Sequence, residues 1–134
     1  MDREKILSAI SSAIGYLENS SKLFSNKEEG ETYNLVWRAS SDVEYCLFLF
    51  SLLHPNEAES FSLKRESSSK QMEIQPVLTS ALNMLEEAKS CIENGDFAKA
   101  HEKTWEARVY LFKVQKIFEK QRKIGAERSS TPSS

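Results

Sequence analysis

Residues 96–112, DFAKAHEKTWEARVYLF, carry the longest helical pattern in the chain and decide how the rest of the sequence is interpreted. Apolar or small residues recur there at steps of three and four, which places them on one face of a helix. The pattern continues on the C-terminal side and predicts a helix over about 97–123. Immediately before it, Gly95 is suited to end one helix, and the Asp96 side chain is suited to cap the next.

Three more stretches show the same helical period. They predict helices over about 3–25, about 31–53 and from about 72 to 94, with Pro76 in the first turn of the third, where its missing amide costs little. Gly30 is interpreted as the breaker of a short polar connection over residues 26–30. The second helix is expected to stop at His54, because the residue before a proline is displaced from the helical region.

The chain resembles itself when it is shifted by 68 residues. Positions 6–50 then lie over 74–118 without a gap, and the two tryptophans of the protein coincide. Self-similarity at a fixed offset is typical of a repeated supersecondary unit, here a helical hairpin. The alternative is that any two amphipathic helices align once their apolar stripes are in phase, and both explanations stay open. Identical pairs include Ile6/Ile74, Ala13/Ala81, Leu17/Leu85, Trp37/Trp105, Ala39/Ala107 and Phe50/Phe118.

Four such stripes predict an all-α fold, a four-helix bundle made of two antiparallel hairpins. One domain is expected over 1–124, with hairpin 1 at about 3–53, a flexible linker at about 54–71, hairpin 2 at about 72–123 and a disordered tail at 125–134. The linker is long enough to join the hairpins in either handedness, so the sequence does not determine the topology. Four alanines, which would let the helices approach closely, are expected at one level of the bundle: Ala13, Ala39, Ala81 and Ala107.

Composition narrows the class of protein. A length of 134 residues with 40% hydrophobic residues suits one core, and a net charge of -2 disfavours a protein that coats nucleic acid or a membrane. No signal peptide or membrane-spanning segment is evident, which predicts a soluble cytoplasmic protein without a membrane partner. Cys46 and Cys91 lie within apolar helical patterns, where a structural role is expected.

Some apolar residues exceed what one core needs. The second helix is apolar nearly all round, and the fourth carries a second apolar stripe, so we expect these faces to bind a protein partner or a second copy of the chain as a homodimer. The candidate partner-binding residues are Tyr45, Phe48, Leu49 and Leu52 in the second helix and Trp105, Val109 and Phe112 in the fourth.

Basic residues gather near the C-terminus. Four lysines, Lys113, Lys116, Lys120 and Lys123, recur at steps of three and four and form a ridge that could contact phosphates, which makes nucleic acid a second candidate partner. The simpler interpretation is that cations near a helix C-terminus complement the helix dipole.

The sequence lacks the patterns of an enzyme. It has no glycine-rich phosphate loop and no Glu-x-x-His pair for a di-metal bundle, and its only histidines are His54 and His101. His54 is interpreted as part of a helix end and His101 as a residue of a helix interface. We therefore expect no catalytic residues, no cofactor and no metal.

One short segment resembles known helical families. The turn over residues 92–100, IENGDFAKA, is similar to turns in tetratricopeptide hairpins and in helical bundles of the HEPN kind. The tetratricopeptide Trp-Leu-Gly-Tyr pattern and the HEPN arginine–histidine signature are absent, so no family is assigned. The sequence predicts a non-enzymatic interaction module or small subunit, with a nucleic-acid accessory protein as the alternative.

Overall fold

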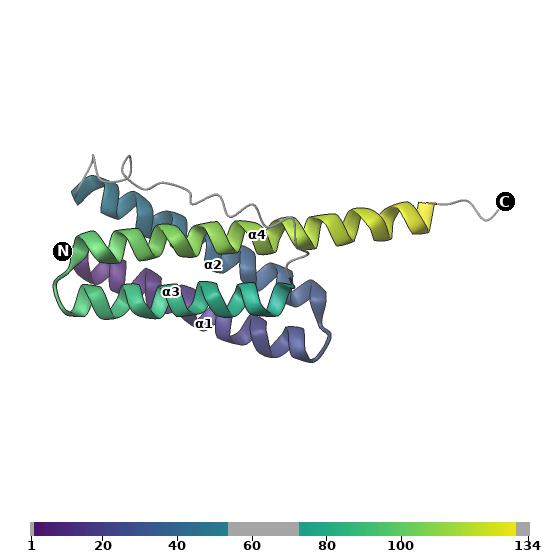
Figure 1. The fold of residues 1–134 in the computed structure, drawn as a ribbon, viewed down its shortest axis with the longest axis horizontal. Coiled ribbons are helices and arrows are strands. Elements are labelled where there is room, and N and C mark those ends of the chain that lie inside the picture. Colours follow the sequence, from purple (N-terminus) through teal and green to yellow (C-terminus); the bar gives the residue numbers. More distant parts are fainter. Residues whose placement is uncertain (1, 54–72, 131–134) are drawn as a thin grey trace.

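The chain folds as an all-α four-helix bundle, as the sequence predicts. The structure is a computed structural model that describes residues 2–53 and 73–130, with side-chain surroundings described for 3–28, 30–53 and 73–121. Its helices are α1 (Asp2–Ser25), α2 (Glu29–Leu53), α3 (Ile74–Glu93) and α4 (Phe97–Ser130). Helix α1 packs along α2 and α3 along α4, and the two hairpins meet through α2 against α4 and α1 against α3 (Figure 1).

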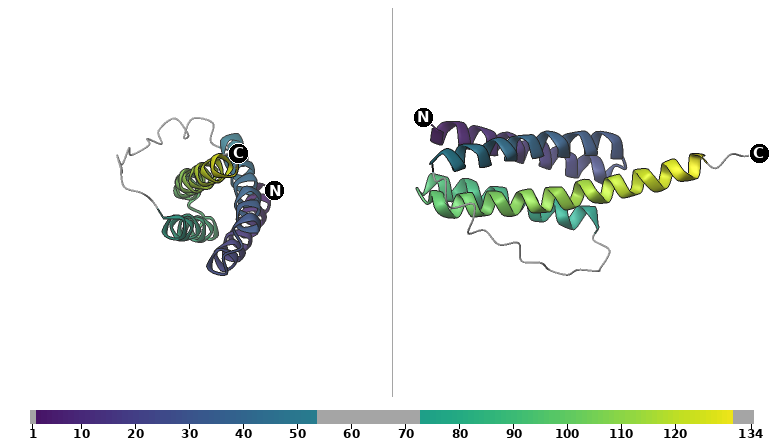
Figure 2. Two further views of the ribbon diagram at one scale, coloured as in Figure 1. Left: turned by 90° about the vertical axis from the view of Figure 1, so that its right-hand side faces the viewer. Right: turned by 90° about the horizontal axis from the view of Figure 1, so that it is seen from above.

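The two hairpins form two layers (Figure 2). Where the layers meet, α2 runs antiparallel to α4 and α1 runs antiparallel to α3. Along α2 and α4, a high residue number in one helix meets a low number in the other. Phe50 stacks on His101, Glu44 bonds to Arg108, and Tyr33 meets Phe118. In the same way Gln75, at the start of α3, donates a 2.6 Å hydrogen bond to Ser21, near the end of α1.

This arrangement determines which ends of the bundle the connection between the hairpins joins. The C-terminal end of α2 and the N-terminal end of α3 lie at opposite ends of the bundle (Figure 1). Because the 25 residues of α2 rise about 37 Å, a tight turn could not join the hairpins. The predicted flexible linker, residues 54–71, lies outside the described residues.

The two hairpin turns have the same hydrogen bonds at the same repeat positions. In the first, the Lys27 and Glu28 amides donate to the Phe24 and Leu23 carbonyls at 3.0 and 2.9 Å. In the second, the Gly95 and Asp96 amides donate to the Ile92 and Cys91 carbonyls at 3.0 and 2.8 Å. Both are Schellman turns, whose C′ residue takes a positive φ: 64° at Lys27 and 82° at Gly95.

One turn prediction holds and one fails. The Asp96 carboxylate accepts a bond from the Lys99 amide at 3.2 Å, which confirms the predicted cap. The breaker predicted at Gly30 is wrong, because α2 already begins at Glu29. The chain reverses instead at Lys27. This residue is at the C′ position of the Schellman turn, which requires the left-handed conformation.

Lys27→Gly is expected to raise the free energy of unfolding by about 0.5–1 kcal/mol. Lysine pays a steric cost at positive φ that glycine avoids, and this gain exceeds the extra entropy of glycine in the unfolded chain. The matched change Gly95→Ala should cost about 1 kcal/mol for the same reason, since no atom lies within 4 Å of the added Cβ. Urea unfolding measures both, and equal signs for the two variants would contradict this account.

The buried positions of hairpin 1 recur in hairpin 2, as the hydrogen bonds of the turns do. Pairs related by the 68-residue shift are buried together: Ile6/Ile74, Ala9/Val77, Ile10/Leu78, Ala13/Ala81, Leu17/Leu85, Ser20/Ala88, Thr32/Ala100, Val36/Thr104, Ala39/Ala107, Val43/Leu111, Cys46/Val114 and Phe50/Phe118. The Schellman turns at matching positions are a second likeness beyond the shared helical period, although this turn is common at helix ends. The matching turns therefore favour an internal duplication, with the hairpins related by an approximate two-fold axis.

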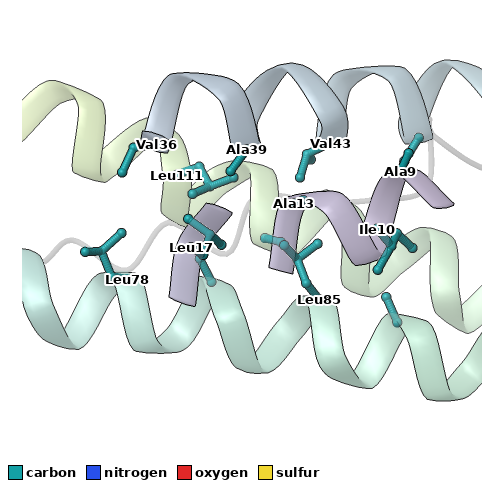
Figure 3. Close-up of a cluster of buried hydrophobic side chains, with 14 of the residues drawn as sticks. Ala9, Ile10, Ala13, Leu17, Val36, Ala39, Val43, Leu78, Leu85 and Leu111 are labelled. Carbon is teal, nitrogen blue, oxygen red and sulfur yellow. The ribbon is translucent and has the colours of Figure 1, made fainter. Parts of the chain in front are cut away.

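The expectation that the four alanines share one level is wrong. Because the hairpins are antiparallel, Leu111 of α4 points toward Ala39 of α2, and Leu85 of α3 points toward Ala13 of α1 (Figure 3). Ala13 and Ala39 of hairpin 1 thus pack against larger side chains of hairpin 2. Large side chains packed against small ones fill the core at the density that native interiors have.

Helix α4 is longer than predicted. It continues through Gly125 to Ser130 and projects beyond the other helices (Figures 1 and 2), so residues 125–130 of the predicted tail are helical. A glycine costs an exposed helix only about 1 kcal/mol, which does not by itself end a helix of otherwise favourable composition. The rest of the predicted tail, 131–134, lies outside the described residues.

Candidate interaction surface

The large exposed apolar side chains lie on two adjacent helices of the bundle. Among the described residues, all six lie on α2 or α4 and none on α1 or α3. They are Trp37 (46% exposed), Tyr45 (46%), Phe48 (58%), Leu52 (60%) and Leu53 (39%) on α2, and Phe112 (55%) on α4. We call the outer surface of α2 and α4 that carries Trp37, Tyr45, Phe48, Leu52 and Phe112 the α2/α4 face.

The helical period explains why these side chains point outward. On α2, Trp37, Tyr45, Phe48 and Leu52 follow one another at steps of eight, three and four, opposite the stripe that contains Val36, Val43 and Phe50. Helix α2 contacts both α1 and α4, and these neighbours cover the rest of its circumference.

The structure exposes several of the predicted partner-binding residues and corrects one. Tyr45, Phe48, Leu52 and Phe112 are exposed on the α2/α4 face, whereas Trp105 and Val109 are partly buried beside them. The prediction for Leu49 is wrong, since it is 4% exposed and belongs to the core. Helix α2 needs a broader buried arc than one stripe, because it packs on two neighbours.

Sequence reasoning missed Trp37 as a surface residue. Its repeat counterpart Trp105 is among the predicted partner-binding residues and Trp37 is not, but Trp37 is about half exposed and Trp105 is partly buried. The spacing of Trp37 to Tyr45, Phe48 and Leu52 could have revealed the surface stripe. Tyr33 supports the Trp37 ring edge-on, with centroids 6.1 Å apart.

An ion pair lies across the middle of the face. Arg108 of α4 donates a hydrogen bond to the Glu44 carboxylate of α2, and both side chains are about half exposed. By the antiparallel register, Phe48 lies one turn from this pair at the level of Trp105. Phe112 lies one turn to the other side, toward Trp37. Aromatic side chains thus flank the ion pair at both ends.

The predicted lysine ridge lies beside this face. Lys113 is partly buried, with its ammonium 5.4 Å from the centroid of the Tyr110 ring, and Lys116 sits 5.2 Å from that of Phe112. Lys120 is exposed. The side chain of Lys123 lies outside the described residues.

His101 is part of the helix interface. It is 1% exposed and stacked on Phe50, with ring centroids 4.9 Å apart and planes 10° apart.

Within the described part of the chain, no cluster of three or more His, Cys, Asp or Glu side chains could hold a metal ion.

The cysteines are free and Cys46 is buried. Burial, and to a lesser degree the nearby Asp42 carboxylate, raises the pKa of the Cys46 thiol to about 12. Its sulfur lies 3.8 Å from the Ile6 carbonyl oxygen. The thiol therefore stays protonated near neutral pH and fills the same core position as Val114 in the repeat, whereas a nucleophilic cysteine would need a lowered pKa.

No protein-family model, curated protein or solved structure matches this chain. No helix in the described ranges 2–53 and 73–130 is both long and apolar enough to cross a membrane.

Proposed function

We propose that this protein is a non-enzymatic helical interaction module that binds a protein partner through the α2/α4 face. One observation carries the proposal: every large exposed apolar side chain among the described residues lies on α2 or α4. An even scatter of such residues would be ordinary for a monomer, but a cluster on one side indicates a surface that another molecule covers.

The size of the cluster supports this function. An aromatic or aliphatic side chain that is half exposed offers about 100 Å², so the five residues of the face present on the order of 500 Å² of apolar area. That is near the upper end of the largest apolar patch on a typical monomer. Trp, Tyr and Phe are also the residues enriched at the centre of protein interfaces.

The repeat supplies a comparison within the chain. The positions equivalent to Tyr45, Phe48 and Leu52 are Lys113, Lys116 and Lys120. The same three outward positions of one fold thus carry apolar residues in one hairpin and cations in the other. Because the fold tolerates lysine there, the apolar residues of α2 are not needed to form the hairpin, and binding accounts for them.

Phosphate binding by the lysine ridge has less support. Two of its three described lysines are positioned over aromatic rings, and Glu119 reduces the local positive charge.

A cytoplasmic location is part of the proposal, because free thiols persist in reducing compartments.

Photo-crosslinking in cells tests the proposed function. Phe48 is replaced by p-benzoylphenylalanine, and the matched control carries the same residue in place of Glu86, which is exposed on α3. Discrete protein adducts from position 48 and none from position 86 are expected. The proposal fails if position 48 gives no adduct, or if both positions give the same ones.

A further inference from the structure

The outer stripe of α4 changes character along its length. Its residues follow at steps of three and four in the order Glu102, Trp105, Val109, Phe112, Lys116, Lys120. The stripe thus has an acidic end, an apolar centre and a basic end. Glu102, Lys116 and Lys120 are all exposed.

The neighbouring stripe of α2 runs beside it in the opposite direction. It carries Trp37, Tyr45, Phe48 and Leu52, and its Glu44 neutralises Arg108 at the centre of the face. The charged residues on the outer sides of the two helices include the carboxylates Glu44, Glu102 and Glu119 and the cations Arg108, Lys113, Lys116 and Lys120. A surface that carries both signs of charge can face a second copy of itself with opposite charges opposed.

We propose that the partner covering the α2/α4 face is a second copy of this chain, bound antiparallel around a two-fold axis that lies in the interface, perpendicular to the helices. This proposal rests on the proposed function and names its partner. In this arrangement α2 packs on α2 of the other copy and α4 on α4. Two-fold pairing of one patch with itself is the commonest form of protein oligomer.

Charge complementarity selects the antiparallel direction. A two-fold axis that crosses α4 near residue 110 places Lys116 and Lys120 of one copy near Glu102 of the other, twice in each dimer. Val109 then lies opposite Phe112, and by the register of the two helices Tyr45 lies opposite Trp37 on α2. A two-fold axis parallel to the helices would instead lay α4 on α2 of the other copy and bring Lys116 and Lys120 against an apolar stripe. Such burial of unpaired cations disfavours the parallel dimer.

The available area fits a dimer of this kind. A stable interface buries roughly 800 Å² on each partner, of which about 57–65% is apolar, or about 500 Å². The five exposed apolar side chains of the face offer an area of this order. The face is therefore large enough for an ordinary dimer without any further element.

Charge reversal and mixing test the proposal on the full chain. One variant, Glu102→Lys, makes both ends of the α4 stripe basic, and the other, Lys116→Glu with Lys120→Glu, makes both ends acidic. Each alone should dimerise about tenfold more weakly than the unmodified chain, because like charges then face each other. An equimolar mixture should regain the dimer, because the basic stripe of one variant faces the acidic stripe of the other.

Sedimentation equilibrium gives the dissociation constants, circular dichroism checks that each variant folds, and Glu86→Lys on α3 is the control that should dimerise like the unmodified chain. A monomeric unmodified chain, or variants that dimerise normally, would overturn the proposal, as would a mixture that associates no better than its components. Crosslinking from position 48 distinguishes a failure of the second-copy proposal from a failure of the proposed function. Adducts with a different protein would uphold the proposed function and reject the second copy, whereas no adducts would reject both.

Discussion

Phe50→Ala is expected to lower the free energy of unfolding by about 3–5 kcal/mol, the usual cost of deleting a fully buried phenylalanine. Phe50 is 0% exposed and joins the two hairpins by stacking on His101. Its loss removes apolar burial and opens a cavity where α2 meets α4. Since the stability of a domain this small is itself about 5–15 kcal/mol, the variant should be marginal. Chemical denaturation followed by circular dichroism measures the change.

The repeat supplies the matched variant. Phe118 occupies the equivalent position, is 3% exposed, and packs edge-on against Phe24 and Tyr33 with centroids 6.3 and 5.4 Å away. Phe118→Ala should therefore cost a similar 3–5 kcal/mol. Phe48→Ala, on the exposed face of α2, should change the stability of the dilute chain by less than about 0.5 kcal/mol. If Phe50→Ala cost no more than Phe48→Ala, the assignment of the two faces of α2 would be wrong.

Phe48→Glu is expected to abolish association through the α2/α4 face while leaving the hairpins folded. Phe48 is 58% exposed, near the middle of the apolar stripe, where interface residues typically contribute most to binding. A central aromatic residue contributes about 2 kcal/mol or more. It occurs twice in a two-fold dimer, so the dissociation constant should rise by about three orders of magnitude. Sedimentation equilibrium provides the measurement.

The control for this variant introduces the same charge elsewhere. Asn83→Glu places a carboxylate at an exposed site on α3, away from the α2/α4 face, and should leave the dissociation constant unchanged. Thermal melts of both variants in dilute solution should match that of the unmodified chain. Equal weakening by Asn83→Glu would show that net charge, and not the apolar face, controls association.

The sequence predicted the helices and the core well because both depend on local periodicity. The buried residues Ile10, Leu17 and Leu85 lie on the stripes where steps of three and four place them. The 68-residue shift indicated an internal duplication from the sequence alone. The hydrogen bonds of the two turns now support it at an independent level, since those bonds depend on backbone conformation and not on apolar phase.

What the sequence did not reveal depends on contacts between elements. A single stripe assigned Leu49 to the outside, but α2 packs on both α1 and α4, so its buried arc also includes that residue. Trp37 is absent from the predicted partner-binding residues, yet α2 leaves it about half exposed. The relative direction of the two hairpins could not be predicted from the sequence. The connection between them is long enough to join them in either direction.

The candidate site was predicted in part. Periodicity identified Tyr45, Phe48, Leu52 and Phe112 as surplus apolar residues, and all four are exposed. That they share one side of the bundle follows only from the packing of α2 on α4. The polarity of the α4 stripe could have been noticed in the sequence, but its relation to the α2 stripe depends on the antiparallel register.

Light scattering from the unmodified full chain over a range of concentrations tests the central claim most directly, that a second copy covers the α2/α4 face. The account predicts that the molar mass rises with concentration from the 15.3 kDa of one chain to twice that value and stops there. A mass of 15.3 kDa at every concentration would contradict it, as would growth beyond the dimer.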